Sequence, residues 1–387
     1  MPQHRHMATP QFRMVAGEAS GDMLAGLLLK GMHEHWPDVQ AAGIGGSLMQ
    51  AQGFDCWWPY DKLAVHGYVD AIKSYRELSA LRRQVGDRIL ADRPAAFIGV
   101  DAPDFNLGLE KRVRQAGIKA IHFVSPSIWA WRGWRMKAIK ESTDLVLCLF
   151  PFEPVIYEKA GVAATYVGHP LADEIPLEID QQGARAEFNL QNAPDAVIAI
   201  MPGSRRSEMQ RLGAPFLATA RKLLQYRPQA HFLFPVAPGL MSMALPLVQA
   251  SGLPPERIQV TEGRAGQVLA ACDVALIASG TATLEAALYK RPMVIAYKVG
   301  AISGFILRRM SYLPWIGLPN ILCKESMVPE RVQAQVTPEQ LAQDLLAWLD
   351  APGKMESLQK RFTELHVLLR QNTAKMATNA IVQALGC

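Results

Sequence analysis

The sequence lacks the features that mark several classes of protein. Its five cysteines are scattered and odd in number, and no CxxC pair is present, so we expect neither a disulfide framework nor a zinc site. There is no HExxH motif, and no apolar run approaches the roughly 20 residues that span a bilayer. The first dozen residues lack the apolar segment of a secretory signal. These absences predict a protein of a reducing cytosol that is soluble or lies on a membrane surface.

Composition and length set the broad class. Half of the residues are hydrophobic and 19% are charged, which is the balance of a globular protein. A formal net charge of +5 favours phosphate-bearing ligands or an anionic surface, but it is too small to predict nucleic-acid binding. With 387 residues, the chain is too long for one ordinary core, so we expect two domains.

Short apolar segments alternate with segments of helical spacing in two series, separated by a linker rich in proline and acidic residues at 169–194. This alternation predicts an α/β protein with two doubly wound, Rossmann-like domains that face each other across a cleft. We place the N-terminal domain at 12–170 and the C-terminal domain at 171–354. The expected strands are 13–16, 41–44, 95–100, 119–124, 145–149, 165–167, 196–201, 230–235, 257–261, 274–278 and 293–297.

In such sheets, ligands bind beyond the carboxyl ends of the strands. Residues 273–289 read as a strand, a tight turn at Ser279 and Gly280, and a helix from Thr281. The start of that helix offers unpaired N–H groups and a partial positive charge to a phosphate. Glu285, about one turn later, could accept hydrogen bonds from a ribose. The alternative is an ordinary strand-to-helix junction in which Thr281 is the N-cap and Glu285 a favourable first-turn charge.

A second loop of the same domain has the character of an anion site. Gly203 and Ser204 form a turn, and Arg205 and Arg206 follow at the start of a helix, where guanidinium groups and the helix N-terminus act together. The alternative is a solvated basic helix start. Because both loops belong to the second domain, we expect that domain to hold a diphosphate.

The N-terminal domain carries a candidate base. Asp101 lies at the tip of a predicted strand, from which its carboxylate could reach into a cleft and act as a general base. Asp104, three residues later, has the position of the N-cap of a helix that begins near Phe105. The loop at 17–22 is not GxGxxG, so the dinucleotide fingerprint is absent, and it reads equally well as a tight turn that Ser20 or Asp22 caps.

Three stretches combine apolar and basic residues. The predicted helix from Tyr68 fits a membrane-surface helix and equally an ordinary core-facing helix; from spacing alone we prefer the core slightly. A run at 304–316 has the same character and makes a lipid partner more plausible. A tryptophan-rich segment at 127–140 could stack on nucleic-acid bases, but we favour packing against the core.

Seven motifs, in order, resemble the lipid-A-disaccharide synthase family, and the resemblance extends from about Met14 to the C-terminal helices. The motifs are VAGEASGD (15–22), GVDAPDFN (99–106), VSPSIWAW (124–131), GHPLAD (168–173), MPGSRRSE (201–208), ASGTATLE (278–285) and LPNIL (318–322). The resemblance implies a GT-B fold and an inverting, metal-independent glycosyltransferase of family 19. It implies a peripheral protein of the cytoplasmic face of the inner membrane, in lipid A and lipopolysaccharide biosynthesis.

The resemblance also implies the substrates. UDP-2,3-diacylglucosamine would donate its sugar to 2,3-diacylglucosamine 1-phosphate, which gives a β-1,6-linked disaccharide 1-phosphate and UDP, with no cofactor. Some members form intertwined dimers through the C-terminal segment, so we expect helices within 355–387 to pack back on the N-terminal domain or to be exchanged in a homodimer.

Functional positions carry over from the family by motif. Asp101 matches the general base, and Arg205, Glu285 and Asn320 match positions needed for activity or nucleotide binding. Glu18 and Ser20 match the first-domain loop beside the acceptor. The family's lipid-facing patch matches the helix residues Val69, Ile72, Tyr75 and Leu78, which shifts our preference there to the membrane. Two alternatives stay open: a UDP-sugar epimerase of the same fold, and a membrane-surface protein that binds lipid or nucleotide sugar without turnover.

Overall fold

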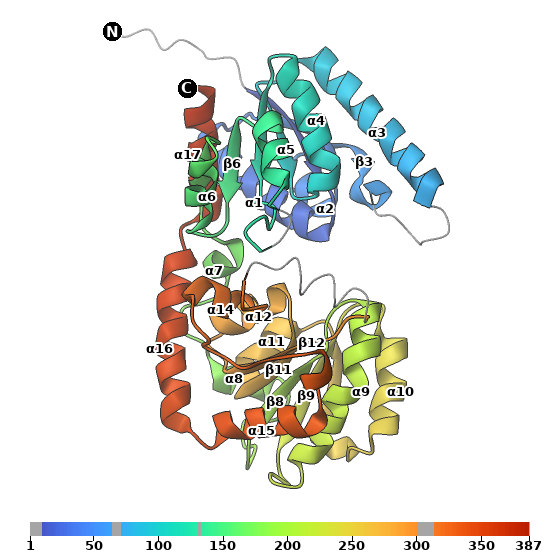
Figure 1. The fold of residues 1–387 in the computed structure, drawn as a ribbon, viewed down its shortest axis with the longest axis vertical. Helices are drawn as coiled ribbons and strands as arrows, with labels where there is room; N and C mark the ends of the chain where they lie inside the picture. The colour runs from blue at the N-terminus through green and yellow to red at the C-terminus, as the bar shows by residue number, and fades with distance from the viewer. Residues whose placement is uncertain (1–9, 64–70, 131–132, 301–312, 387) are drawn as a thin grey trace. The chain divides into compact units, whose positions relative to one another are not determined.

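The computed structural model describes residues 10–63, 71–130, 133–300 and 313–386, and the side chains among these except those of residues 71–75. The chain divides into two units (Figure 1): unit 1 is Met1–Asp173 with Leu369–Cys387, and unit 2 is Glu174–Leu368. We expected the chain to leave the second domain at 355. It does so at 369, because helix α16 (Pro352–Leu369) packs within unit 2, where His366 Nδ1 lies 2.7 Å from Lys290 Nζ.

Unit 1 is built on a seven-stranded parallel sheet with the order β3-β2-β1-β4-β5-β6-β7. Its strands are β1 (Gln11–Ala16), β2 (Gln40–Gly45), β3 (Asp55–Pro59), β4 (Ala96–Val100), β5 (Lys119–Phe123), β6 (Leu145–Cys148) and β7 (Ala164–Tyr166). Its helices are α1 (Ala19–His35), α2 (Ser47–Gln50), α3 (Ala71–Asp92), α4 (Pro103–Gln115), α5 (Arg135–Ser142), α6 (Glu153–Lys159), α7 (Pro170–Glu174) and α17 (Thr373–Leu385). The strand order reverses between β1 and β4, where doubly wound sheets bind ligands.

Alternating side chains of these strands build a core on each face of the sheet. In β1, Met14 packs in a cluster with α1 and α17, whereas Val15 packs in a second cluster with α3 and α4. The period of two in a strand causes this division. Helices therefore cover both faces, as the apolar character of the strands predicts.

Unit 2 repeats this architecture on a six-stranded parallel sheet with the order β10-β9-β8-β11-β12-β13. Its strands are β8 (Val197–Met201), β9 (His231–Val236), β10 (Ile258–Glu262), β11 (Val274–Ala278), β12 (Met293–Tyr297) and β13 (Glu330–Val332). Its helices are α8 (Gln181–Ala186), α9 (Arg206–Leu223), α10 (Met241–Ser251), α11 (Ala265–Ala271), α12 (Thr281–Leu288), α14 (Leu318–Cys323), α15 (Pro338–Leu349) and α16. The order reverses between β8 and β11, so the loops that follow these two strands meet at one edge.

Three helix caps that the sequence suggested, two of them as alternatives, differ from the structure, although α12 begins at Thr281 as expected. Asp104 does not cap α4, because Ala102 is the N-cap and α4 begins at Pro103. Neither Ser20 nor Asp22 caps α1, which begins at Ala19 after Glu18. The buried Asp22 carboxylate instead accepts backbone N–H bonds from the start of α2, at Gly46 (2.8 Å), Leu48 (3.0 Å) and Met49 (3.2 Å). Thr281 is the first residue of α12, and its N-cap is Gly280.

Among the described helices, none combines the length and the apolar character that crossing a bilayer requires. Of the residues expected to face lipid, Val69 lies outside the described residues, and so do the side chains of Ile72 and Tyr75. Leu78 is half-buried and packs against the core that α3 and α4 share with the sheet.

Candidate functional site

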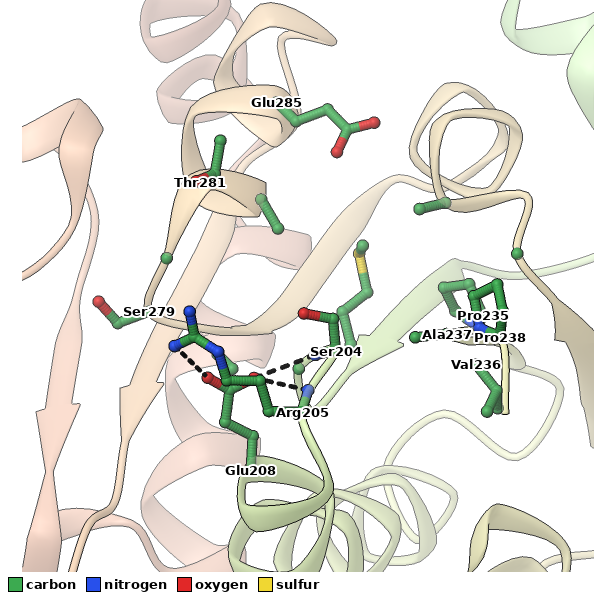
Figure 2. Close-up of a pocket in the computed structure, with 17 residues that line it drawn as sticks. Ser204, Arg205, Glu208, Pro235, Val236, Ala237, Pro238, Ser279, Thr281 and Glu285 are labelled. Carbon is green, nitrogen blue, oxygen red and sulfur yellow. Dashed lines mark hydrogen bonds and ion pairs between the residues drawn. The ribbon is translucent and has the colours of Figure 1, made fainter. Parts of the chain in front are cut away.

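A pocket of about 440 Å³ opens in unit 2 at the carboxyl ends of its strands (Figure 2). It lies where the strand order reverses, between the loops that follow β8 and β11. Of the eight nucleotide-binding residues expected from sequence, seven line it: Gly203, Ser204, Arg205, Ser279, Gly280, Thr281 and Glu285. The fold thus brings together residues that lie some 80 positions apart in the chain.

The start of α12 forms one wall of the pocket. Gly280 is its N-cap, and among the described residues no side chain caps this helix. Thr281 and Ala282, which carry the first N–H groups of α12 and the partial positive charge of a helix N-terminus, line the pocket. Ser279 is fixed before them, since its N–H donates to Ala296 O (3.0 Å) and its Oγ donates to Ile316 O (2.8 Å).

The loop after β8 is organised differently from our expectation. The N–H groups of Ser204 and Arg205 both donate to Glu208 Oε2, at 3.0 and 3.2 Å, so a carboxylate of the protein already occupies the two N–H groups directly before α9. Gly203 makes this arrangement possible, because it has a φ of +113° and a Cβ there would overlap the Glu208 carboxylate. The anion-binding group that this loop offers is therefore the Arg205 side chain, not its backbone.

Arg205 is free to meet a ligand. Its side chain is 79% exposed, and its guanidinium Nη1 lies 3.7 Å from Glu208 Oε1, an ion pair that is long and open to solvent. In the view of Figure 2, the Arg205 side chain lies beside Ser279, while the Glu285 side chain projects from α12 at a distance from Arg205. The pocket thus presents the Arg205 guanidinium beside the Glu208 carboxylate, and a second carboxylate at Glu285.

Glu285 is half-buried in the wall of the pocket. Burial raises the pKa of its carboxyl group, and the nearby Glu174 raises it further. A carboxyl group that lacks a cationic partner in the described structure suits hydroxyl donors, such as those of a ribose, better than a second anion.

Sequence reasoning missed two loops of the pocket. Residues 235–238 span the end of β9 and the loop after it, and Gly263 and Ala265 follow β10; all of them line it. The sequence could have predicted both loops, because Pro, Ala and Gly after a predicted strand indicate a loop at the carboxyl ends of the strands, where the pocket lies.

Asn320, the eighth residue expected at the nucleotide, is not among the residues that line the pocket. Its side chain is 1% exposed and uses both ends of its amide inside the protein. Nδ2 donates to Val328 O (2.9 Å) and Glu330 Oε1 (2.8 Å), and Oδ1 accepts from Val328 N (3.0 Å). In this structure Asn320 is a support for the loops that surround it.

The expected residues of unit 1 gather at its own point of strand reversal. Asp101 follows β4 and has a left-handed φ of +51°, and Ala102 follows with +43°. Non-glycine residues rarely adopt this conformation, and such strain concentrates at functional sites. The buried Asn106 amide holds it in place by donating from Nδ2 to Asp101 O at 2.8 Å.

Glu18 lies on the neighbouring loop, after β1, and Ser20 lies in the first turn of α1; both are exposed. The two loops touch, because a Cβ on Gly17 would overlap that of Ala102. Glu18, Ser20 and Asp101 therefore share one edge of unit 1.

A buried acid–imidazole pair joins α4, the helix that follows Asp101, to the strand β5, and the sequence did not reveal it. His122 Nδ1 and Glu110 Oε1 are 2.6 Å apart, and neither side chain is exposed. Burial raises the pKa of the Glu110 carboxyl group, while His122 opposes this shift. Gly99, which precedes Asp101 by two residues, leaves the space that the Glu110 carboxylate occupies. Among the described residues, no group of His, Cys, Asp or Glu is placed to hold a metal ion.

Comparison with known proteins agrees with this geometry. The family model described as Lipid-A-disaccharide synthetase matches residues 12–384. The chain is 53% identical over 378 residues to a lipid-A-disaccharide synthase of Azoarcus sp. (strain BH72), with 96% of this chain and 95% of that one covered. It is 51% identical over 383 residues to the synthase of Burkholderia lata, with 98% of each chain covered.

Solved structures share the fold at low sequence identity. The UDP-GlcNAc 2-epimerase of Neisseria meningitidis, bound to UDP-GlcNAc, has a TM-score of 0.67 at 10% identity, over 96% of this chain and 100% of that one. The glycotransferase of kitacinnamycin has a TM-score of 0.64 at 13% identity, over 98% and 100%. The two parallel-sheet α/β units are those of a GT-B glycosyltransferase. The chain belongs to the lipid-A-disaccharide synthase family and is a glycosyltransferase of lipid A biosynthesis.

Proposed function

We propose that the protein transfers 2,3-diacylglucosamine from UDP-2,3-diacylglucosamine to 2,3-diacylglucosamine 1-phosphate. The products are UDP and the β-1,6-linked disaccharide 1-phosphate, formed with inversion at the anomeric carbon. The observation that carries the proposal is the unit 2 pocket, in which Arg205, the uncapped start of α12 and Glu285 line one cavity in a chain of this family.

In this proposal the pocket holds the UDP part of the donor. The diphosphate lies between the Arg205 guanidinium and the N–H groups of Thr281 and Ala282, which stabilise the charge that develops as UDP leaves. The Glu285 carboxylate accepts hydrogen bonds from the ribose hydroxyls. We propose that these groups supply the positive charge without a metal ion.

Asp101 is the proposed general base. It would take the proton from the 6-hydroxyl of the acceptor as that oxygen attacks the anomeric carbon in a single displacement. The constrained backbone at Asp101 and Ala102 supports this role, since it fixes the direction of one carboxylate. Glu18, on the touching loop, and Ser20, in the first turn of α1, would contact the acceptor.

Both proposed substrates carry acyl chains in a membrane, so we propose that the protein works at the cytoplasmic face of the inner membrane as a peripheral protein. A homodimer through the C-terminal segment is part of the same proposal. The expected membrane patch at 69–78 lies mostly outside the described side chains, so the support is the nature of the substrates and the net charge of +5.

The test is a turnover assay with radiolabelled UDP-2,3-diacylglucosamine and the monosaccharide phosphate. We expect UDP release only when the acceptor is present, and full activity in excess EDTA. Release of UDP without the acceptor, or a 2-epimerised sugar, would favour the epimerase alternative, whose fold the chain shares.

The proposed base can be tested separately. Replacing Asp101 by Asn keeps the shape of the side chain but removes its basicity, so we expect turnover to fall by about 10²–10⁴-fold. The affinity for UDP should stay within about twofold, since Asp101 lies in unit 1 and the UDP pocket in unit 2. Near-normal turnover of this variant would move the role to Glu18 or Asp104.

A further inference from the structure

Glu330, the first residue of β13, binds the loop that precedes α14. Its carboxylate accepts from the N–H of Ile316 at 2.8 Å and from the N–H of Gly317 at 2.9 Å. One carboxylate thereby fixes two consecutive peptide groups. The side chain is half-buried, so these hydrogen bonds are partly shielded from water.

Asn320 sets the direction of that carboxylate. Its Nδ2 donates to Glu330 Oε1 at 2.8 Å, while its other hydrogen bonds, to both backbone groups of Val328, hold the segment before β13. With 1% of its surface exposed, Asn320 has no free polar atom to offer a nucleotide. Gly317 lets the loop come close, because a Cβ there would overlap the Ile295 side chain of β12.

The loop that Glu330 holds is bonded in turn to the pocket. Ile316 O accepts a hydrogen bond from Ser279 Oγ, with 2.8 Å between the two oxygens. Ser279 lines the pocket and directly precedes Gly280 and the start of α12. The path from Asn320 to Glu330, to Ile316 and to Ser279 contains three side-chain hydrogen bonds, each 2.8 Å long. It ends at the turn whose N–H groups we assign to the diphosphate.

We infer that Glu330 is a positioning residue of the nucleotide pocket, and that Asn320 acts on the nucleotide through Glu330 and not by contact. The inference rests on the proposed function, in which this pocket holds UDP. Loss of the Glu330 carboxylate would release Ile316 and Gly317, leave Ser279 Oγ with a displaced acceptor, and loosen the turn at the start of α12. The donor site would then be intact in composition but less well ordered before the ligand binds.

The first test is Glu330→Gln, with UDP affinity measured by isothermal titration calorimetry and with kcat and KM for the donor. A glutamine keeps the shape but places an NH2 group against a backbone N–H, so one of the hydrogen bonds is lost and two donors face each other. We expect the Kd for UDP and the donor KM to rise about tenfold, with a smaller change in kcat.

The matched control is Asp273→Asn. The Asp273 carboxylate also accepts a hydrogen bond from a backbone N–H, that of Val197 at 2.8 Å. Asp273 precedes β11, so it lies at the amino ends of the unit 2 strands, whereas the pocket lies at their carboxyl ends. We expect this variant to lower the melting temperature with UDP affinity within about twofold of wild type. Equal loss of affinity in both variants would show general destabilisation and overturn the inference.

A double-mutant cycle tests the order of the path. If Asn320 acts through Glu330, the double variant Glu330→Gln, Asn320→Ala should have a Kd for UDP no higher than that of the single variant that binds UDP less tightly. Additive losses, or a Glu330→Gln variant with wild-type affinity, would overturn the inference. If Asn320→Ala does not fold, the comparison of Glu330→Gln with Asp273→Asn decides alone. Failure of the wild-type protein to bind UDP would instead refute the proposed function.

Discussion

His169 is a buried imidazole of unit 1 with one fixed hydrogen bond. Its Nδ1 accepts from Leu171 N at 3.3 Å, its ring stacks on Phe150 with 5.7 Å between centroids, and 6% of its surface is exposed. Burial lowers its pKa to about 4, against a smaller opposite effect of Asp173. It is therefore neutral in the folded protein at neutral pH.

This shift predicts a pH dependence of stability. Above pH ~6.5, where an unfolded histidine is also neutral, the contribution of His169 is fully present. As the pH falls from about 6.5 to about 4, the unfolded state binds a proton that the folded state does not. The free energy of unfolding should then drop by about 3 kcal/mol from this group.

The comparison is with His169→Asn, whose Oδ1 can accept the same hydrogen bond but does not titrate. In urea unfolding at pH 7.5 and 4.5, we expect wild type to lose more stability than the variant. The opposite contribution of Glu153, whose pKa burial raises to about 7, is present in both proteins and cancels. Parallel losses in the two proteins would contradict the assignment.

At the scale of residues, the sequence locates polar groups at strand ends but does not show where their side chains point. Arg205 and Glu285 line one pocket because each follows a strand of a parallel sheet closely, and the sequence shows that position. Asn320 follows Ile316, which is bonded to the pocket residue Ser279, by only four residues. Its amide nevertheless donates to Val328 and Glu330 and not into the pocket. That choice depends on residues eight and ten positions later, which spacing does not reveal.

At the scale of elements, the start of α9 depends on one glycine. Gly203 has a φ of +113° and leaves the space in which the Glu208 carboxylate binds Ser204 N and Arg205 N. Because the carboxylate occupies the N–H groups of Ser204 and Arg205, the group of this loop that we assign to a phosphate is the Arg205 side chain. The motif predicted an anion at this loop, but the protein supplies that anion itself.

Gly203→Ala should therefore displace Glu208 and disorder the start of α9. We expect unit 2 to lose about 1–3 kcal/mol of stability, and UDP to bind more weakly because Arg205 is no longer held at the pocket. Gly117→Ala in unit 1 is the control, since Gly117 has a φ of +82° but open space around its missing Cβ. UDP titration and thermal unfolding of both variants check the prediction, and equal UDP affinities would contradict it.

The central strands were easier to predict than the edges. The expected bounds of β11 and β12 agree with the structure residue for residue, since both are short, wholly apolar runs between turns. The edge strands β3 and β13 were missed, because they are half-exposed and lack a continuous apolar run.

At the scale of the whole molecule, the chain returns to unit 1 through α17. The Asp173 carboxylate accepts from Asn372 N at 2.8 Å and from Thr373 N at 2.6 Å, and Ile381 is fully buried in the cluster that α17 shares with α1 and the sheet. The alternation of strands and helices sufficed to predict two units. It could not predict the return at 369, because the apolar spacing of α16 is the same whichever unit it packs against.

Ile381→Ala should test the return. Removing this buried side chain should cost unit 1 about 2–4 kcal/mol. UDP affinity, a property of unit 2, should not change at temperatures well below unfolding. Met376→Ala, on the same helix but 36% exposed, should cost much less. Equal effects of the two variants in thermal unfolding would show that α17 does not pack as described.

The most direct measurement is a crystal structure of the wild-type protein with UDP bound. We predict the diphosphate within hydrogen-bond distance of the Arg205 guanidinium and the N–H groups of Thr281 and Ala282, with the ribose hydroxyls on Glu285. UDP bound elsewhere on the protein, or a diphosphate that touches neither Arg205 nor the start of α12, would contradict the proposed function.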